Sequence, residues 1–160
     1  MRMKSPNESI AFSSWEGRKM QLTEQKTCIV VGIANPRTRL RVSVLLSTVP
    51  DYQVRYITTE EQVSEMIEEA DMIIGTGIIA REGVMHRKPV IVLGDYGFGG
   101  LVTPNTFRSH FNNCFRGKNN GMKDDYFSLD KLEGEIKKAF NLTYQELQMM
   151  SNQTLTFLNT

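Results

Sequence analysis

Few residues in this sequence suit a metal site or a disulfide bond. There are two cysteines and two histidines among 160 residues. Cys28, Cys114, His86 and His110 have none of the spacings typical of metal ligands, so no metal site is expected. A disulfide between the cysteines is not expected in a reducing compartment. Cys28 lies in a strand-like apolar run and is expected to be a buried free thiol.

Net charge and long apolar runs are also lacking. The formal net charge is +1 at pH 7, so no broad electrostatic field would attract nucleic acid. No apolar run approaches the roughly 20 residues that a membrane span needs. The first 15 residues have no continuous apolar core of the kind found in signal peptides. We therefore expect a cytoplasmic protein that does not bind nucleic acid.

What the sequence does contain is enough apolar residues for one core. The hydrophobic share of 40% and charged share of 23% are typical of a globular domain. Strands are expected at residues 27–31, 53–58, 71–74 and 89–93, and helices at 36–48, 59–70, 78–86, 104–111, 129–140 and from 143 onward. This alternation predicts a single α/β domain over residues 27–160, a Rossmann-like parallel sheet with helices on both faces. Residues 1–26 are polar and weakly patterned, and are expected to form a partly disordered N-terminal arm.

Local signals mark several of the expected helices. Pro36 suits a first helical turn, and Thr103 followed by Pro104 predicts an N-cap and a helix start. Thr143 with Glu146 three residues later predicts a capping box. In residues 37–48, one buried helical face is expected to carry Leu40, Val42, Val44, Leu45 and Leu46.

The segment from residue 70 to residue 103 has the pattern of a strand–helix–strand unit with two small-residue turns. The first turn is Gly75-Thr76-Gly77, and a glycine-rich loop at residues 97–100 follows the second strand. Both turns are expected at the sheet edge where ligands of parallel α/β proteins bind. A helix start offers unpaired N–H groups and the positive end of the helix dipole, which suit a phosphate. The alternative is a plain strand-to-helix turn, which also uses glycine.

The charged residues near these turns each allow two interpretations. Glu82 lies in an otherwise apolar stretch, so its carboxylate could accept hydrogen bonds from a ribose diol. Alternatively it is a surface acid paired with Arg81 or His86. Arg37 and Arg41, one helical turn apart, could reach a phosphate or could simply face solvent.

Two common nucleotide motifs and a catalytic set are missing. Gly97 and Gly99 have the spacing of the dinucleotide fingerprint, but Val102 occupies the third glycine position. No GxxxxGK[ST] motif is present, so NAD binding and ATP hydrolysis are excluded on these grounds. Asp95 follows the fourth strand but has no evident partner, and no Ser or Cys has the surroundings of a nucleophile.

The segment ADMIIGTGIIAREGVMHRKPVIVLGDYGFGGLVTP, residues 70–104, resembles the donor-binding C-terminal domain of glycosyltransferases with the GT-B fold. Shared features are a strand, a small-residue corner, a helix with an acid, a Lys-Pro pair, a second strand and a glycine pair. By this resemblance Glu82 would bind the ribose hydroxyls of a nucleotide-diphosphate sugar, and no other cofactor is implied. The implied nucleotide-sugar site consists of Gly75, Thr76, Gly77, Arg81, Glu82, Gly99, Gly100 and Thr103.

The chain also departs from that family. Ile74 stands where many retaining members have a second glutamate, and Ile33 stands where a basic residue often follows the first strand. Arg37 or Arg39 would then be substitutes. The family's acceptor domain usually supplies the catalytic base, whereas only 26 residues precede the first expected strand here.

These departures predict a donor-binding half that works with a separate acceptor-binding chain, which could hold it at a membrane periphery, or a remnant of a longer transferase. Sugar transfer would require the acceptor domain. A homo-oligomer is compatible with the sequence. The alternative from a different class is a non-catalytic α/β interaction module without a nucleotide site.

Overall fold

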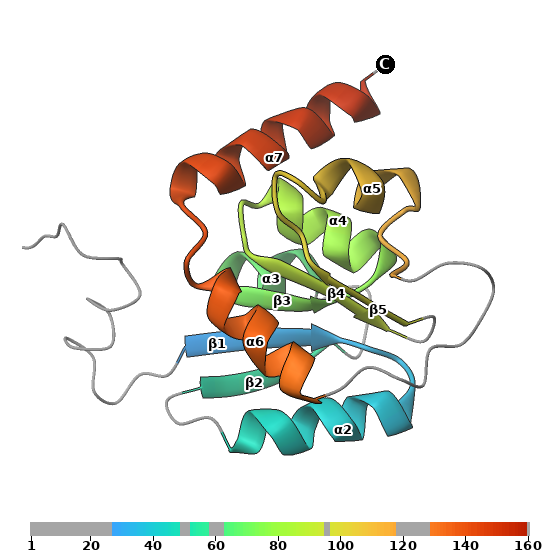
Figure 1. Cartoon of the computed structure of the whole chain (residues 1–160), viewed down its shortest axis with the longest axis vertical. Coiled ribbons are helices and arrows are strands. Elements are labelled where there is room, and N and C mark those ends of the chain that lie inside the picture. The colour runs from blue at the N-terminus through green and yellow to red at the C-terminus, as the bar shows by residue number, and fades with distance from the viewer. Residues whose placement is uncertain (1–26, 49–51, 58–62, 95–96, 118–128, 160) are drawn as a thin grey trace, which may run out of the picture.

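A computed structural model describes residues 27–48, 52–57, 63–94, 97–117 and 129–159 (Figure 1). The predicted N-terminal arm at residues 1–26, the predicted helix start at residue 59 and Asp95 lie outside these ranges. None of the described helices is long and apolar enough to cross a membrane.

The described chain forms one five-stranded sheet in the order β2-β1-β3-β4-β5. The strands are β1 (Thr27–Gly32), β2 (Tyr52–Tyr56), β3 (Met72–Gly75), β4 (Val90–Gly94) and β5 (Gly97–Leu101). The first four are parallel, and β5 runs antiparallel to β4. The predicted α/β fold with a parallel sheet is therefore confirmed, with an additional antiparallel strand at one edge.

Helices cover both faces of the sheet, as predicted. One face packs against α2 (Pro36–Ser47) and α6 (Leu129–Ala139). The other packs against α3 (Val63–Glu69), α4 (Gly77–Met85), α5 (Phe107–Asn112) and α7 (Tyr144–Leu158) (Figure 1). Alternation along β1 divides its side chains between these layers, since Ile29 and Val31 enter the first core and Val30 the second.

The expected glycine-rich loop is a strand, so that prediction was wrong. Gly97 pairs with Gly94 and Gly100 pairs with Val92, with an irregularity between Val92 and Leu93. Gly100 has φ +85°, a conformation that a residue with a side chain rarely adopts. The glycines thus allow this edge strand to bend and to lie close to the helices on either side.

The predicted buried face of α2 was also partly wrong. Val42 and Leu46 are buried, but Leu40 and Val44 are 65% and 54% exposed. Leu40 and Val44 are one helical turn apart on the side opposite the sheet, so apolar character alone did not identify the buried stripe. Asn35 caps α2 by accepting from the N–H groups of residues 37 and 38.

Two predicted helix starts had different outcomes. The capping box of α7 is confirmed: Thr143 Oγ1 accepts from the Glu146 N–H at 3.1 Å, and Glu146 Oε1 accepts from the Thr143 N–H at 2.9 Å. By contrast, α5 begins at Phe107, three residues beyond Pro104. Thr103 and Thr106 instead exchange hydrogen bonds in a turn, and Thr106 Oγ1 also donates to the Leu101 carbonyl.

Candidate functional site

The corner between β3 and α4 lies where the strand order reverses. β1 lies between β2 and β3 in the sheet. Gly32 pairs with Gly75 at the carboxyl ends of β1 and β3. In open α/β sheets this switch point is where ligands bind. The predicted turn Gly75-Thr76-Gly77 therefore occupies the expected edge of the sheet.

The Ile79 side chain packs against the carboxyl ends of both β1 and β3. A Cβ atom added to Gly32 would lie 2.7 Å from Ile79 Cδ1, and one added to Gly75 would lie 3.2 Å from Ile79 Cγ2. Both glycines are thus explained by the packing of α4 on the sheet. Any ligand at this edge must lie further out, beside the first turn of α4.

Gly77 is the first residue of α4 and has a left-handed backbone conformation. Its φ is +62°, and nothing lies within 4 Å of a Cβ built on it. Its N–H donates to the Phe115 carbonyl at 2.9 Å, which ties the helix start to the turn after α5. Thr76 is the N-cap residue but makes no side-chain capping bond, and its Cγ2 packs toward Gly94 instead.

A cavity of about 410 Å³ opens between this helix start and the turn after α5. Its lining residues are Gly77, Ile78, Arg81, Phe111, Cys114, Phe115 and Arg116. Two arginines, Arg81 and Arg116, therefore line the cavity, with no acid among the described lining residues. Among the described residues, Arg81 Nε is buried without a hydrogen-bond partner.

The wall opposite α4 has an unusual backbone. Cys114 and Phe115 have φ values of +60° and +57°, although neither is glycine. Left-handed backbone at such residues costs free energy and tends to occur at functional sites. The Phe115 ring stacks on His110, with ring centroids 6.3 Å apart and an interplanar angle of 2°. Burial lowers the pKa of His110, opposed by a hydrogen bond with the Leu101 backbone.

The structure brings together only some of the predicted site residues. Gly77 and Arg81 line the cavity, and Gly75 and Thr76 lie in the adjoining corner. Glu82 is half-buried on α4 but is not among the described residues that line the cavity. Successive helical residues point about 100° apart, so Glu82 diverges from Arg81.

The surroundings of His86 bear on the surface-acid interpretation of Glu82. His86 Nδ1 donates to the Glu82 carbonyl oxygen at 2.8 Å rather than to its carboxylate. His86 Nε2 lies 3.6 Å from Glu68 Oε2. The predicted position of His86 at the end of α4 is confirmed. The carboxylate near its ring belongs to Glu68 and not to Glu82.

Gly99, Gly100 and Thr103 are not among the described residues that line the cavity. A Cβ on Gly99 would lie 3.1 Å from His110 Cε1, and one on Gly100 would lie 2.8 Å from Glu135 Oε1. The lack of a side chain at Gly99 and Gly100 therefore allows α5 to pack closely on one face of β5 and α6 on the other. Thr103 follows β5 at the amino end of β4, since the Val102 N–H donates to the Val90 carbonyl. Because β5 is antiparallel, Thr103 is carried to the sheet edge opposite the Gly75–Gly77 corner.

Sequence reasoning missed the cavity residues in the last turn of α5 and in the segment after it. Phe111, Phe115 and Arg116 reach the cavity only because the turn after α5 folds back onto α4 through the Gly77–Phe115 hydrogen bond. No local motif marks that contact. Arg37, by contrast, is exposed at the start of α2, which packs on the other face of the sheet from α4.

The described part of the chain was also compared with the requirements of a metal centre. No group of three or more His, Cys, Asp or Glu residues in the described ranges could hold a metal ion. Cys28 is half-buried, and its pKa is raised by burial and then by the nearby Asp71 carboxylate.

Comparison of the chain with family models, curated proteins and solved structures gave no match.

Proposed function

We propose that the chain binds a nucleotide-diphosphate sugar in the cavity beside α4, as the donor-binding half of a GT-B type glycosyltransferase. A separate acceptor-binding chain would complete the enzyme, or the chain would be a remnant that binds donor alone. The observation that carries the proposal is the pair Arg81 and Arg116 beside the first turns of α4.

The chemistry of the cavity fits a diphosphate. Guanidinium groups bind phosphate oxygens with paired hydrogen bonds, and a helix start adds N–H groups and positive charge. A buried donor without a partner is unusual, and an anion in the cavity would supply the acceptor for Arg81 Nε. The volume of about 410 Å³ lies within the usual range for small-molecule sites.

Glu82 retains its proposed role as a ribose ligand, at a different position from the diphosphate. It lies five residues beyond Gly77, roughly 7.5 Å further along the axis of α4. A nucleoside diphosphate anchored at the helix start is long enough to reach it. Gly99, Gly100 and Thr103 have no place in the proposed site.

The alternative of a non-catalytic interaction module is favoured by one set of observations. Gly32 and Gly75 are explained by contact with Ile79, and Gly99 and Gly100 by contact with α5 and α6. Gly75, Gly99 and Gly100, which the resemblance assigns to donor binding, therefore have a structural reason to be there. The two functions differ in whether the cavity takes a ligand.

Titration with UDP, GDP, UDP-glucose and GDP-mannose, followed by amide NMR, tests the proposal. Shifts are expected in residues 77–82 and 111–117. Arg81→Gln and Arg116→Gln should each weaken binding at least about tenfold, as expected for a lost charge-assisted hydrogen bond. The matched control Arg37→Gln removes an exposed arginine on the opposite face of the sheet and should leave binding unchanged.

The absence of shifts at millimolar ligand would reject donor binding and favour the interaction module. Binding that is sensitive to Arg37→Gln but not to the two cavity variants would place the ligand on the α2 side of the sheet. For the split enzyme, affinity capture from the native host should recover an acceptor-binding chain; capture of none would favour a remnant.

A further inference from the structure

The outer face of α7 differs in composition from a solvent-exposed helix surface. Glu146 is the single charged residue in the 15 residues of α7, and it is engaged in the capping box. Four of the seven exposed large apolar side chains in the described ranges belong to this helix: Tyr144, Met149, Leu155 and Leu158. Of these four, Met149 lines the hollow described below. On the outer face itself, Met149 and the half-buried Phe157 accompany this depletion of charge. Depletion of charge together with Met and aromatic residues is typical of the centre of a protein interface.

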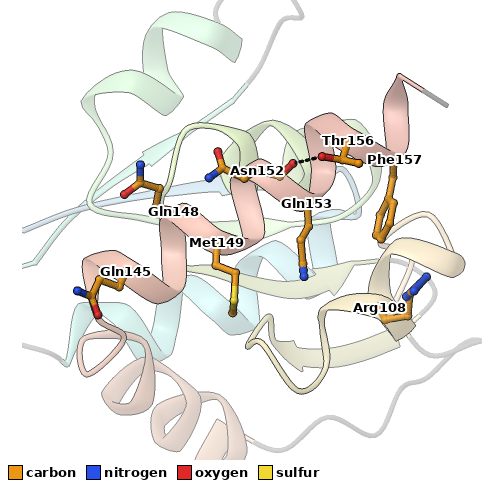
Figure 2. Close-up of a pocket in the computed structure, with 8 residues that line it drawn as sticks. All are labelled: Arg108, Gln145, Gln148, Met149, Asn152, Gln153, Thr156 and Phe157. Atoms are coloured by element: carbon orange, nitrogen blue, oxygen red, sulfur yellow. Dashed lines mark hydrogen bonds between the residues drawn. The ribbon is translucent and has the colours of Figure 1, made fainter.

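A broad hollow of about 640 Å³ runs along this face, between α7 and α5. Figure 2 shows Gln145, Met149 and Gln153 projecting from the helix, and Arg108 from α5 beside Phe157. The Arg108 guanidinium carbon lies 4.8 Å from the centre of the Phe157 ring. The hollow therefore has neutral amides along its length and one cation at the carboxyl end of α7.

We propose that this face binds a second copy of the chain, with the two α7 helices antiparallel about a two-fold axis near Asn152. Glutamine and asparagine amides both donate and accept hydrogen bonds, so a face built from them is complementary to itself. A two-fold pair requires that self-complementarity, because each surface meets its own copy. A neutral face also avoids the like-charge repulsion that a charged face would meet.

Charge complementarity supports the antiparallel arrangement. Arg108 lies by the carboxyl end of α7, whereas Glu146 lies in its first turn. Antiparallel pairing brings Arg108 of one copy toward Glu146 of the other, twice in the dimer. A parallel arrangement would place each arginine near its own counterpart. The pairing does not depend on the nucleotide-sugar site, because the described residues that line the hollow and the cavity are different.

Sedimentation equilibrium of the full chain, from about 5 to about 500 µM, tests the pairing. A dimer with micromolar affinity is expected. Asn152→Lys puts two lysines together at the axis and should weaken association at least about tenfold. Gln53→Lys adds the same charge at an exposed position on β2 and should not change it. Circular dichroism melts of each variant confirm that it is folded.

Arg108→Gln and Glu146→Gln test the predicted cross-pair. Glutamine can still complete the capping box, so the second variant removes charge while keeping the helix start. Each should weaken the dimer severalfold, and the double variant should lose little more than either single one. A chain that stays monomeric throughout the range, or a dimer unaffected by Asn152→Lys, would overturn the proposal.

Discussion

At the scale of single residues, the two cysteines differ in both exposure and chemistry. Cys114 is exposed on the cavity wall, whereas Cys28 is half-buried with its pKa raised. Because the thiolate is the reactive form, Cys114 should react with iodoacetamide at least about ten times faster than Cys28 at neutral pH. Peptide mass spectrometry over a time course measures both rates in one sample. Equal rates would contradict the burial of Cys28.

The two histidines provide a similar comparison of pH dependence. Burial lowers the pKa of His110, so between the unfolded value of about 6.5 and the lower folded value only the unfolded chain binds the proton. The contribution of His110 to the free energy of unfolding is therefore complete above a pH of about 6.5. It is lost as the pH falls toward the folded pKa of His110.

Urea unfolding at pH values of about 7.5 and 5.5 should give a smaller difference in unfolding free energy for His110→Gln than for the unmodified chain. His86→Gln is the control, since His86 is a helix-end residue with a partly exposed side chain. If both variants respond to pH as the unmodified chain does, His110 is not the residue responsible.

Glu82 is the residue to which the donor proposal assigns a contact with the ribose. If its carboxylate binds ribose hydroxyls, Glu82→Ala should weaken binding of a UDP sugar by about 1.5–3 kcal/mol, the range for a charged hydrogen bond. Glu133→Ala, an exposed acid on α6, serves as the control. Isothermal titration calorimetry measures both affinities. An unchanged affinity in Glu82→Ala would make Glu82 a surface acid.

At the scale of elements, the sequence predicts best where the signal is local. Pro36, the Thr143–Glu146 capping box and the apolar runs of the four parallel strands lie in the elements that they predict. β5 was missed because its conformation depends on partners distant in sequence. Pairing with β4 and the Leu101 N–H bond to Glu135 Oε1, at 2.9 Å, favour a strand where glycine content suggests a loop.

α2 offers a direct test of which apolar residues support an element. Leu46 is 1% exposed and Leu40 is 65% exposed, although both were expected on one buried face. Leu46→Ala should lower the unfolding free energy by about 2–5 kcal/mol, because it leaves a cavity in the core. Leu40→Ala, the same change on the outer side, should alter it by less than about 0.5 kcal/mol. Urea denaturation measures both, and equal losses would contradict the orientation of α2.

At the scale of the whole molecule, the position of the candidate site was predictable but its composition was not. Alternating strands and helices, with a glycine corner after β3, were enough to indicate the carboxyl edge of the sheet. Arg116 and Phe111 could not be assigned, because their approach to Arg81 follows from the path of the chain through β5 and α5. The antiparallel turn of β5 moves Thr103 away and returns the segment after α5 to the cavity.

Because the cavity joins elements from separate parts of the chain, a bound ligand should stabilise the fold as one unit. α4 and the turn after α5 both contribute lining residues, and the Gly77–Phe115 hydrogen bond links them. At a ligand concentration of about 100 times Kd, binding adds about 2.7 kcal/mol, which would raise Tm by about 5–10 °C for a domain of this size. Differential scanning calorimetry with UDP-glucose or GDP-mannose should show one transition that moves upward. Arg81→Gln with Arg116→Gln should remove most of the shift at the same ligand concentration, whereas Arg37→Gln should retain it. A shift that survives in full in the double cavity variant would mean that the ligand stabilises the domain from another site, since these two guanidinium groups would then contribute nothing to its binding.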